Sequence, residues 1–409
     1  MTEAPGRVRA VARVGGVPAP PPGPVVLVRR RRPGHLGWLS VGQLLLAEVL
    51  LVGVLALAGV NEWVMIAAAV VFLAVLVVLF GRRQGRWWTE RMLLSWRIKQ
   101  RRNAEPGPAR DPRLAAVRVL SPDLTVSTYE ASDGERVGVA RDSTGWFAVA
   151  AVTYPVVGRG GFVRLPLDRL AQALREMGQP GSVVQVLVQS VPAPTSEIDS
   201  RNRCVSSYRE LLGQHGAVPA DRTVWVAVRL EAQPFIEAWV DEHDPIDQAP
   251  AVVAALIRRM GRVIRRDALG YQTLDEGALL DTLVRALDLE QDPAAEQPQE
   301  TWEQWRSAHL TQACFWVREW PDPAQGAAML EQIAAVPAAS TTISLVLDAQ
   351  SELTDLRCLV RVATRQYGLA ATVTAMEDVV RQCGGDLLRL DGEHGPAVYA
   401  TAPTGGGAQ

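Results

Sequence analysis

Two apolar runs near the N-terminus, residues 39–58 and 64–80, constrain this chain more than any other feature of its sequence. A helix of about 20 residues rises roughly 30 Å, which is the thickness of the hydrocarbon core of a bilayer, and about 17 residues is the short end of the usable range. Only five residues separate the two runs. The pattern therefore predicts a transmembrane helical hairpin over residues 38–80.

Arginines flank both outer ends of this hairpin, whereas the connecting turn carries a single charge, Glu62. Because arginines in short loops stay on the cytoplasmic side, both chain termini are expected to be cytoplasmic and the protein to reside in the plasma (inner) membrane. No apolar core occurs in the first 35 residues, so a cleavable signal peptide is not expected. Glu48 lies within the first span, where a carboxylate is costly in lipid, so a contact with another helix is favoured over proton conduction.

Residues 81–102 mix tryptophan with positive charge directly after the second span. Such a segment is typical of an amphipathic helix that lies along the inner membrane surface, with its rings at head-group depth and its guanidinium groups on phosphates. The residues expected to contact lipid or a partner here are Arg82, Arg83, Arg86, Trp87, Trp88, Arg91, Trp96 and Arg97.

The net charge of −2 conceals two opposed blocks, since residues 1–102 carry a net charge of +11 and residues 103–409 a net charge of −13. The first block suits anionic lipid head groups, and the second argues against nucleic acid as a partner. The four cysteines, Cys204, Cys314, Cys358 and Cys383, are widely spaced without any C-x-x-C pair. They are therefore expected to be apolar core residues and not zinc or redox ligands.

The remaining sequence predicts an α/β (α+β) cytoplasmic region built from two tandem ferredoxin-like modules. After a β-hairpin start, the order β-α-β-β-α-β occurs once over strands 146–153, 183–190, 223–230 and 271–274 with helices 167–177 and 250–268, and an inserted helix at 199–213. It recurs over strands 309–318, 341–349, 356–366 and 386–391 with helices 323–335 and 369–384. Whether the two copies are a true duplication stays open. The predicted divisions are a disordered basic, proline-rich tail at 1–37, a first module at 103–288, a linker at 289–300, a second module at 301–403 and a disordered tail at 404–409.

Catalytic motifs are absent from the sequence. The only lysine is Lys99 in the juxtamembrane segment, so no P-loop exists, and the zinc-hydrolase, serine-hydrolase and dinucleotide signatures are missing as well. The polar stretch Asp241-Glu242-His243-Asp244 predicts a solvated loop, and Asp391-Gly392-Glu393-His394 predicts a hairpin turn between two closing strands. We therefore predict no catalytic residue, no cofactor and no metal site.

The helix expected near residues 252–266 carries five arginines on one side and an apolar stripe on the other. Like charges this close repel unless something neutralises them. The face that includes Arg258, Arg259 and Arg262 is either solvated or a dock for an acidic partner, and the sequence leaves both interpretations open.

In the order of these features the chain resembles EccE, a membrane component of the type VII (ESX) secretion system of actinobacteria. The resemblance rests on the basic tail, the hairpin, the arginine–tryptophan segment and the stretches at residues 223–229, 341–345, 389–393 and 400–403. It departs at His394, where glutamine is common in the family. The resemblance implies a non-enzymatic structural subunit of an inner-membrane core complex, with EccB, the ATPase EccC and EccD as partners.

A membrane-tethered enzyme is the alternative, of glycosyltransferase-like type and acting on a lipid-linked substrate. Buried carboxylates that converge in a cleft would favour this alternative, and a shallow surface without them would favour the structural subunit.

Overall fold

The structure, a computed structural model, describes the chain after residue 82 with several gaps, and only scattered positions before it. The described ranges are 70–75, 82–83, 86–104, 107–131, 133–154, 165–192, 221–238, 245–292, 296–348, 354–365 and 367–407, with scattered positions between 35 and 67 and between 203 and 210. Most of the predicted membrane hairpin and of the predicted helix 199–213 therefore lies outside the described residues. Within the described part, no helix has both the length and the apolar character needed to cross a bilayer.

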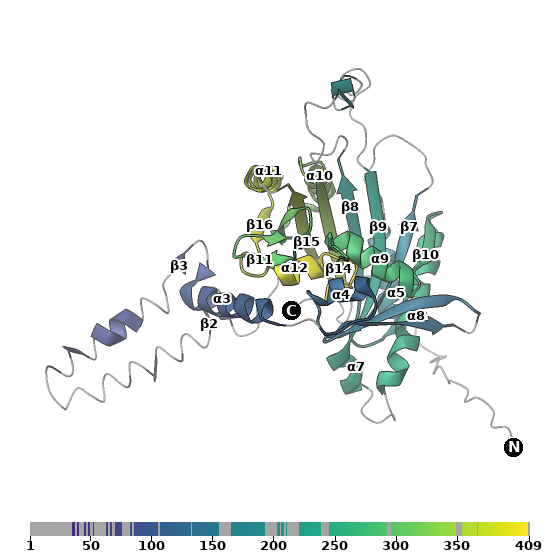
Figure 1. Ribbon diagram of the computed structural model, residues 1–409, viewed down its shortest axis with the longest axis horizontal. Coiled ribbons are helices and arrows are strands. Elements are labelled where there is room, and N and C mark those ends of the chain that lie inside the picture. The colour runs from purple at the N-terminus through teal and green to yellow at the C-terminus, as the bar shows by residue number, and fades with distance from the viewer. Residues whose placement is uncertain are drawn as a thin grey trace.

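The first half of the folded region, residues 112–287, is built around one antiparallel group of strands (Figure 1). The strands lie side by side in the order β10-β7-β9-β8, and β6 and β5 continue the sheet beyond β7. The elements are α4 (Pro112–Arg118), β5 (Thr125–Glu130), β6 (Arg136–Asp142), β7 (Gly145–Thr153), α5 (Leu167–Met177), β8 (Ser182–Val191), β9 (Asp221–Glu231), α7 (Ala232–Ala238), α8 (Pro245–Arg265), β10 (Gly270–Thr273) and α9 (Glu276–Leu287).

The second half repeats this arrangement, with its strands in the order β16-β13-β15-β14 and every neighbouring pair antiparallel. A short ribbon precedes it, β11 (Gln299–Glu300) and β12 (Trp305–Arg306), which extends the sheet from β13. The remaining elements are β13 (Thr311–Glu319), α10 (Pro323–Ala334), β14 (Ser340–Asp348), β15 (Asp355–Thr364), α11 (Leu369–Gln382), β16 (Asp386–Arg389) and α12 (His394–Ala400).

The two halves share one sheet. Strands β8 and β14 pair antiparallel over eight residue pairs, from Thr341 opposite Ser190 to Asp348 opposite Val183, so strands β5 to β16 form a single twelve-stranded sheet. Both strands are almost wholly buried. The prediction of an α/β region with antiparallel strands is confirmed, and the junction between the halves is a backbone ladder in addition to a linker.

Helices cover both faces of this sheet. Strand β7 shows how the residues divide, because Trp146 and Ala148 join the core on one face while Phe147 and Val149 join the core on the other. Helices α5, α8, α10 and α11 pack on the first face, and α4, α9 and α12 pack on the second. Because both faces are buried, strands such as β7 are nearly continuous apolar runs.

Three local expectations differ from the structure at the C-terminal end. The predicted last strand ends at Arg389, and the residues after Gly392 form helix α12, so the turn joins a strand to a helix and is not a hairpin. Gly392 is a turn glycine as expected, with φ of +79°. The glycine-rich end is packed as far as residue 407: Thr404 is fully buried, and the Gly405 amide donates to Gln185 Oε1 at 2.8 Å. Glycine composition predicted disorder, but here it lets the chain pass closely over Arg229, because a Cβ at Gly405 would lie 2.3 Å from the Arg229 Cβ.

The juxtamembrane segment also begins differently from its prediction. Helix α3 (Trp88–Arg102) starts at Trp88, and a two-residue ribbon, β3 (Arg82–Arg83) with β4 (Arg86–Trp87), stands where the first turns of the helix were expected. A similar short pair, β1 (His35–Leu36) with β2 (Leu39–Ser40), occurs where the first predicted span begins.

Candidate partner interface

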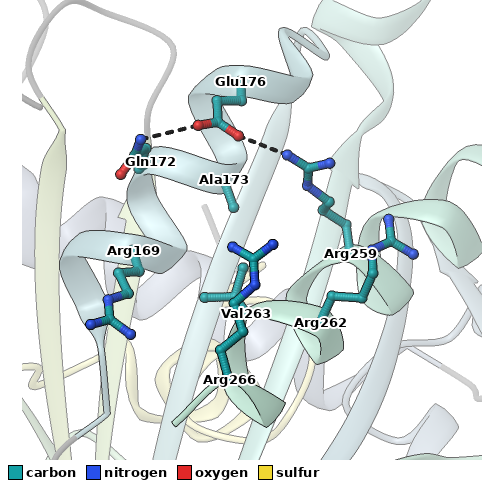
Figure 2. Close-up of a pocket in the computed structure, with 8 residues that line it drawn as sticks. All are labelled: Arg169, Gln172, Ala173, Glu176, Arg259, Arg262, Val263 and Arg266. Carbon is teal, nitrogen blue, oxygen red and sulfur yellow. Dashed lines mark hydrogen bonds and ion pairs between the residues drawn. The ribbon is translucent and has the colours of Figure 1, made fainter. Parts of the chain in front are cut away.

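A positively charged hollow of the described surface is a groove between α5 and α8, with a volume of about 290 Å³ (Figure 2). Its apolar floor is made by Ala173 and Val263, which are both buried. Arginines from both helices surround the same space (Figure 2). We call this hollow the arginine groove. The lining residues are Arg169, Gln172, Ala173 and Glu176 from α5, with Arg259, Arg262, Val263 and Arg266 from α8 and its end.

Internal ion pairs neutralise part of this positive charge. Arg259 pairs with Glu176 at 2.7 Å, and Glu176 also accepts from Gln172 at 3.0 Å. Arg169 pairs with Asp267. Arg262 and Arg266 are not buried, and neither forms an ion pair within the described part of the chain. The groove therefore keeps a positive charge that no described carboxylate balances.

The three arginines singled out from the sequence are not equivalent in the structure. Arg259 and Arg262 line the arginine groove, whereas Arg258 turns toward the β5–β6 connection, where it pairs with Asp133 and, at 3.0 Å, with Glu135. Sequence reasoning missed Arg169, since it lies on α5, about 90 residues before α8. Only the packing of α5 against α8 brings its charge to the same groove.

A second exposed surface belongs to helix α3. Leu94 and Ile98 are buried. About one helical turn after Ile98, the guanidinium of Arg101 donates two hydrogen bonds to the carboxylate of Glu300, with nitrogen–oxygen distances of 2.9 and 3.1 Å. The guanidinium of Arg91 lies 4.3 Å from the ring centre of Trp302. These contacts hold α3 against the β11–β12 ribbon of the second half.

The opposite side of α3 is apolar yet exposed. Its residues Trp88, Met92, Leu93 and Trp96 are between 44 % and 78 % accessible, and Arg97, next to Trp96 in the chain, is also exposed. A helix that is apolar on two faces needs a second environment besides the domain it packs on. Glu48 is a helical residue with an exposed side chain, whereas the side chains of Arg82, Arg83, Arg86 and Trp87 lie outside what the structure describes.

A sequence comparison assigns the region that carries the basic helix to a known family. A protein-family model with the description "Putative type VII ESX secretion system translocon, EccE" matches residues 218–317. The resemblance to EccE is confirmed over these residues. No curated protein matches the sequence of the chain.

The EccE match indicates a component of a type VII secretion system. It runs from β9 to β13, so it includes all of α8 with Arg259 and Arg262, while α5 and Arg169 lie outside it. The match also includes Glu300 and Trp302, which contact Arg101 and Arg91 of α3.

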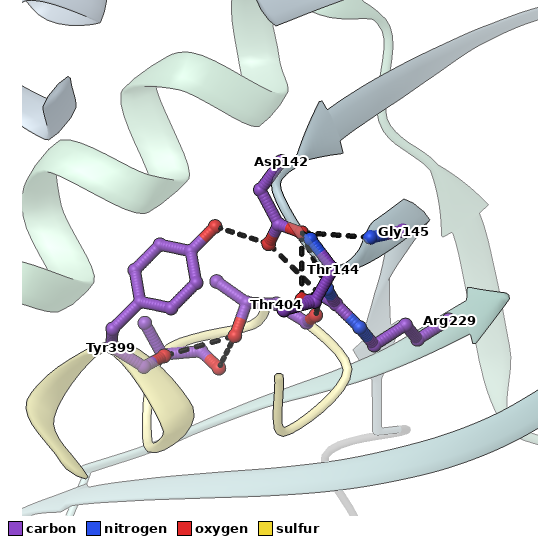
Figure 3. Close-up of polar contacts among 7 residues, drawn as sticks. Asp142, Thr144, Gly145, Arg229, Tyr399 and Thr404 are labelled. Atoms are coloured by element: carbon purple, nitrogen blue, oxygen red, sulfur yellow. Dashed lines mark hydrogen bonds and ion pairs between the residues drawn. The ribbon is translucent and has the colours of Figure 1, made fainter. Parts of the chain in front are cut away.

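A buried polar network lies on the other face of the sheet, where the two halves meet (Figure 3). Arg229 of β9 donates to both oxygens of Asp142 and, at 2.9 Å, to the carbonyl of Thr404. Asp142 further accepts from the Thr144 amide at 2.9 Å, the Gly145 amide at 3.0 Å and the Tyr399 hydroxyl at 2.9 Å. The Asp142–Arg229 pair thus joins the β6–β7 turn, strand β9, helix α12 and the C-terminal segment.

The electrostatics of this network keep Asp142 ionised. Burial alone would raise the pKa of Asp142, but the hydrogen bond and the charge of Arg229, with further hydrogen bonds from Thr144, outweigh it and hold the pKa below its ordinary value. Burial also raises the pKa of the Tyr399 hydroxyl, so that group stays protonated and donates.

Asp142 and Glu300 both line a second hollow of about 430 Å³ beside this network, together with Tyr399 and Trp305. Each carboxylate is already bound to an arginine, Asp142 to Arg229 and Glu300 to Arg101. Glu300 also accepts from the Gly395 amide at 2.9 Å. Both carboxylates are thus engaged by hydrogen-bond donors within the fold.

The other predicted positions have different outcomes. The stretch Asp241 to Asp244 lies outside the described residues. Cys314 and Cys358 are buried core residues as expected, and burial raises the pKa of the Cys314 thiol to about 12. Cys383 is only half-buried, and Cys204 is exposed, so the expectation of four core cysteines is wrong for Cys204. Within the described ranges, no three metal-binding side chains come together.

His394 is fully buried at the start of α12, which the sequence did not predict. Its Nδ1 accepts from the Cys314 amide at 3.3 Å, and its Nε2 lies 3.5 Å from Asp391 Oδ1. Burial lowers the pKa of His394 below its ordinary value, although Asp391 opposes the shift. The ring is therefore neutral in the folded protein at neutral pH.

This burial predicts an acid-sensitive contribution to stability. Because the folded-state pKa lies below the unfolded value of about 6.5, the unfolded chain takes up the proton first as the pH falls, so stability is full above about pH 6.5 and declines below it. His394→Gln should flatten this decline, as measured by urea unfolding of the detergent-solubilised chain between about pH 7 and pH 5. An unchanged slope in His394→Gln would contradict the assignment.

Proposed function

We propose that this chain is a non-enzymatic structural subunit of the inner-membrane core complex of a type VII secretion system. The match to EccE supports a role in such a system. The observation that carries the structural role is helix α3, which is packed on the soluble region through Leu94, Ile98 and Arg101 and exposes a second apolar face. A helix built in this way connects a domain to a membrane surface at a set angle.

The membrane part of the proposal rests on the sequence. Two apolar runs at residues 39–58 and 64–80 precede α3, and arginines outnumber acidic residues on both outer sides. The exposed tryptophans Trp88 and Trp96 suit the head-group depth of a bilayer, and Arg97 beside them suits anionic phosphates. We therefore place α3 on the cytoplasmic membrane surface, with the soluble region below it.

For the soluble region we propose two ferredoxin-like modules. In such a module the element order β-α-β-β-α-β gives a sheet in which the fourth strand lies beside the first and the third lies between the first and second. The orders β10-β7-β9-β8 and β16-β13-β15-β14 both fit this description. The modules meet through their second strands, β8 and β14, and the second face of each sheet is covered by α4, α9 and α12.

A structural role agrees with the chemistry of the buried groups. The two carboxylates that line the larger hollow, Asp142 and Glu300, are each held by an arginine. The proposed partners are the other membrane subunits, EccB, the ATPase EccC and EccD, together with anionic lipid head groups. The sequence itself has no P-loop, so energy from ATP would enter the complex through EccC.

Membrane topology provides the test. In a Cys204→Ser background, which removes the exposed native thiol, single cysteines replace Asn61 in the predicted turn and Tyr367, which is 96 % exposed on the soluble region. An impermeant thiol reagent on intact cells should label Asn61→Cys and leave Tyr367→Cys unlabelled until the cells are lysed. Labelling of Tyr367→Cys alone on intact cells would reverse the orientation and overturn the proposed placement.

A further inference from the structure

We propose that the arginine groove between α5 and α8 binds an acidic, extended peptide segment of a partner protein. This inference rests on the proposed function, since it names a docking surface through which such a subunit would contact another. Four arginines and a single glutamate line the groove, and that glutamate, Glu176, is occupied by Arg259. The groove thus offers an excess of positive charge before any partner arrives.

The positions of the arginines on α8 point to carboxylates on a chain. Arg259, Arg262 and Arg266 stand at helical spacings of three and four residues, so they follow one face of α8. Arg262 and Arg266 form no ion pair with any described residue and are not buried. Their guanidinium groups can each take one carboxylate in a two-pronged contact.

The floor and the length of the groove favour a peptide over a single small anion. The floor, Ala173 and Val263, is apolar and offers nothing to a phosphate, whereas it can receive an apolar side chain. On α5 the lining residues run from Arg169 to Glu176, which is about 10 Å along the helix. About three residues of an extended strand cover that distance.

The location of the groove argues against a lipid occupant. In Figure 1, α3 lies at the left of the long axis, whereas α5 and α8 lie at the right. The groove is therefore at the end of the soluble region that is remote from the helix proposed to contact the membrane. The net charge of −13 over residues 103–409 also disfavours a nucleic acid, which would meet repulsion beyond the groove.

The test measures binding of a defined probe to the full chain in detergent. The probe is a fluorescein-labelled synthetic peptide in which glutamates flank two leucines, followed by fluorescence anisotropy at low salt. We expect saturable binding that the double variant Arg262→Ala/Arg266→Ala weakens about tenfold. Arg365→Ala is the matched control, because Arg365 is an exposed arginine of the second half without a described ion pair, and it should bind as the unaltered chain does. A peptide with glutamine in place of every glutamate should bind at least about tenfold more weakly.

Three results would overturn the inference. Equal affinity in the double variant would show that the peptide binds elsewhere, and no binding to the unaltered chain would show that the groove does not take such a segment. Complete displacement of the peptide by millimolar inorganic phosphate, or by short-chain phosphatidylglycerol, would make it a simple anion or lipid site. Helical content by circular dichroism verifies that the double variant is folded.

Failure of the proposed function would look different. In that case the unaltered full chain would not co-purify with other secretion subunits, whatever its affinity for the peptide. If only the groove inference is wrong, the unaltered chain co-purifies with those subunits while the peptide affinities of the unaltered chain and the double variant are the same.

Discussion

Replacing Asp142 with alanine is expected to lower the free energy of unfolding by about 3–5 kcal/mol, because it leaves the buried guanidinium of Arg229 without its counter-ion. Both side chains are almost completely inaccessible, at 1 % for Arg229 and 2 % for Asp142. The same change removes the acceptor for the Thr144 and Gly145 amides and for the Tyr399 hydroxyl.

Urea unfolding of the detergent-solubilised chain measures this effect. Asp123→Ala is the matched control, because Asp123 is an exposed carboxylate that lines the same hollow as Asp142. It should change stability by less than about 0.5 kcal/mol. An equal decrease in the free energy of unfolding in the two variants would show that the buried Asp142–Arg229 pair stabilises the fold no more than an exposed carboxylate does.

The pH dependence of this pair follows from the direction of its pKa shift. The folded-state pKa of Asp142 lies below its unfolded value, so its contribution is present above about pH 4 and is lost as the pH falls through the folded-state pKa. In Asp142→Asn this loss at low pH should disappear, although the variant is less stable at neutral pH. A variant with the same acid-induced decline as the unaltered chain would show that other carboxylates dominate.

Reversing the charge of Arg101 should release helix α3 from the soluble region. Glu300 has a side chain that is only 3 % exposed, so Arg101→Glu would place a second carboxylate against a buried one, at a cost of about 3 kcal/mol or more. Hydrogen exchange of α3 and of the β11–β12 ribbon should rise markedly in this variant, since the helix would detach locally while the sheet remains folded. Under the proposed function, secretion should fall as well.

The neighbouring residue is the matched control for that experiment. Arg102 is exposed, and the structure gives it no ion pair with a described residue, so Arg102→Glu changes the net charge by the same amount without touching Glu300. It should leave hydrogen exchange of α3 near that of the unaltered chain. If both variants release α3 equally, overall charge holds the helix in place. The prediction that the Arg101–Glu300 ion pair attaches α3 would then be wrong.

Local periodicity accounts for the elements that the sequence predicted well. The helix at residues 167–177 has the bounds that apolar spacing predicts, and the strands around Trp225 and Ile343 agree to within two residues. In each case neighbouring residues along the chain carry the signal, a period of 3.6 in helices and a run of β-branched residues in buried strands. The apolar runs that predict the membrane hairpin are the same kind of local signal.

Contacts between distant segments were decided by tertiary structure alone. The pairing of β8 with β14 joins residues about 160 positions apart, and nothing within either strand specifies that partner over another buried strand. Glu300 stands in a stretch whose acidic and proline content predicted a linker, yet burial against Arg101 and Gly395 makes it a fixed part of the sheet edge. Tertiary structure also made the arginine groove. Arg169 and Arg262 line the same hollow only because α5 packs on α8.

The division between the two kinds of information has a physical reason. The sequence by itself determined the long helices and the central strands, and it alone predicts the membrane spans, because those choices depend on neighbours in the chain. Which side chains meet depended on how the sheet assembled, because burial and charge pairing are properties of the whole packed fold.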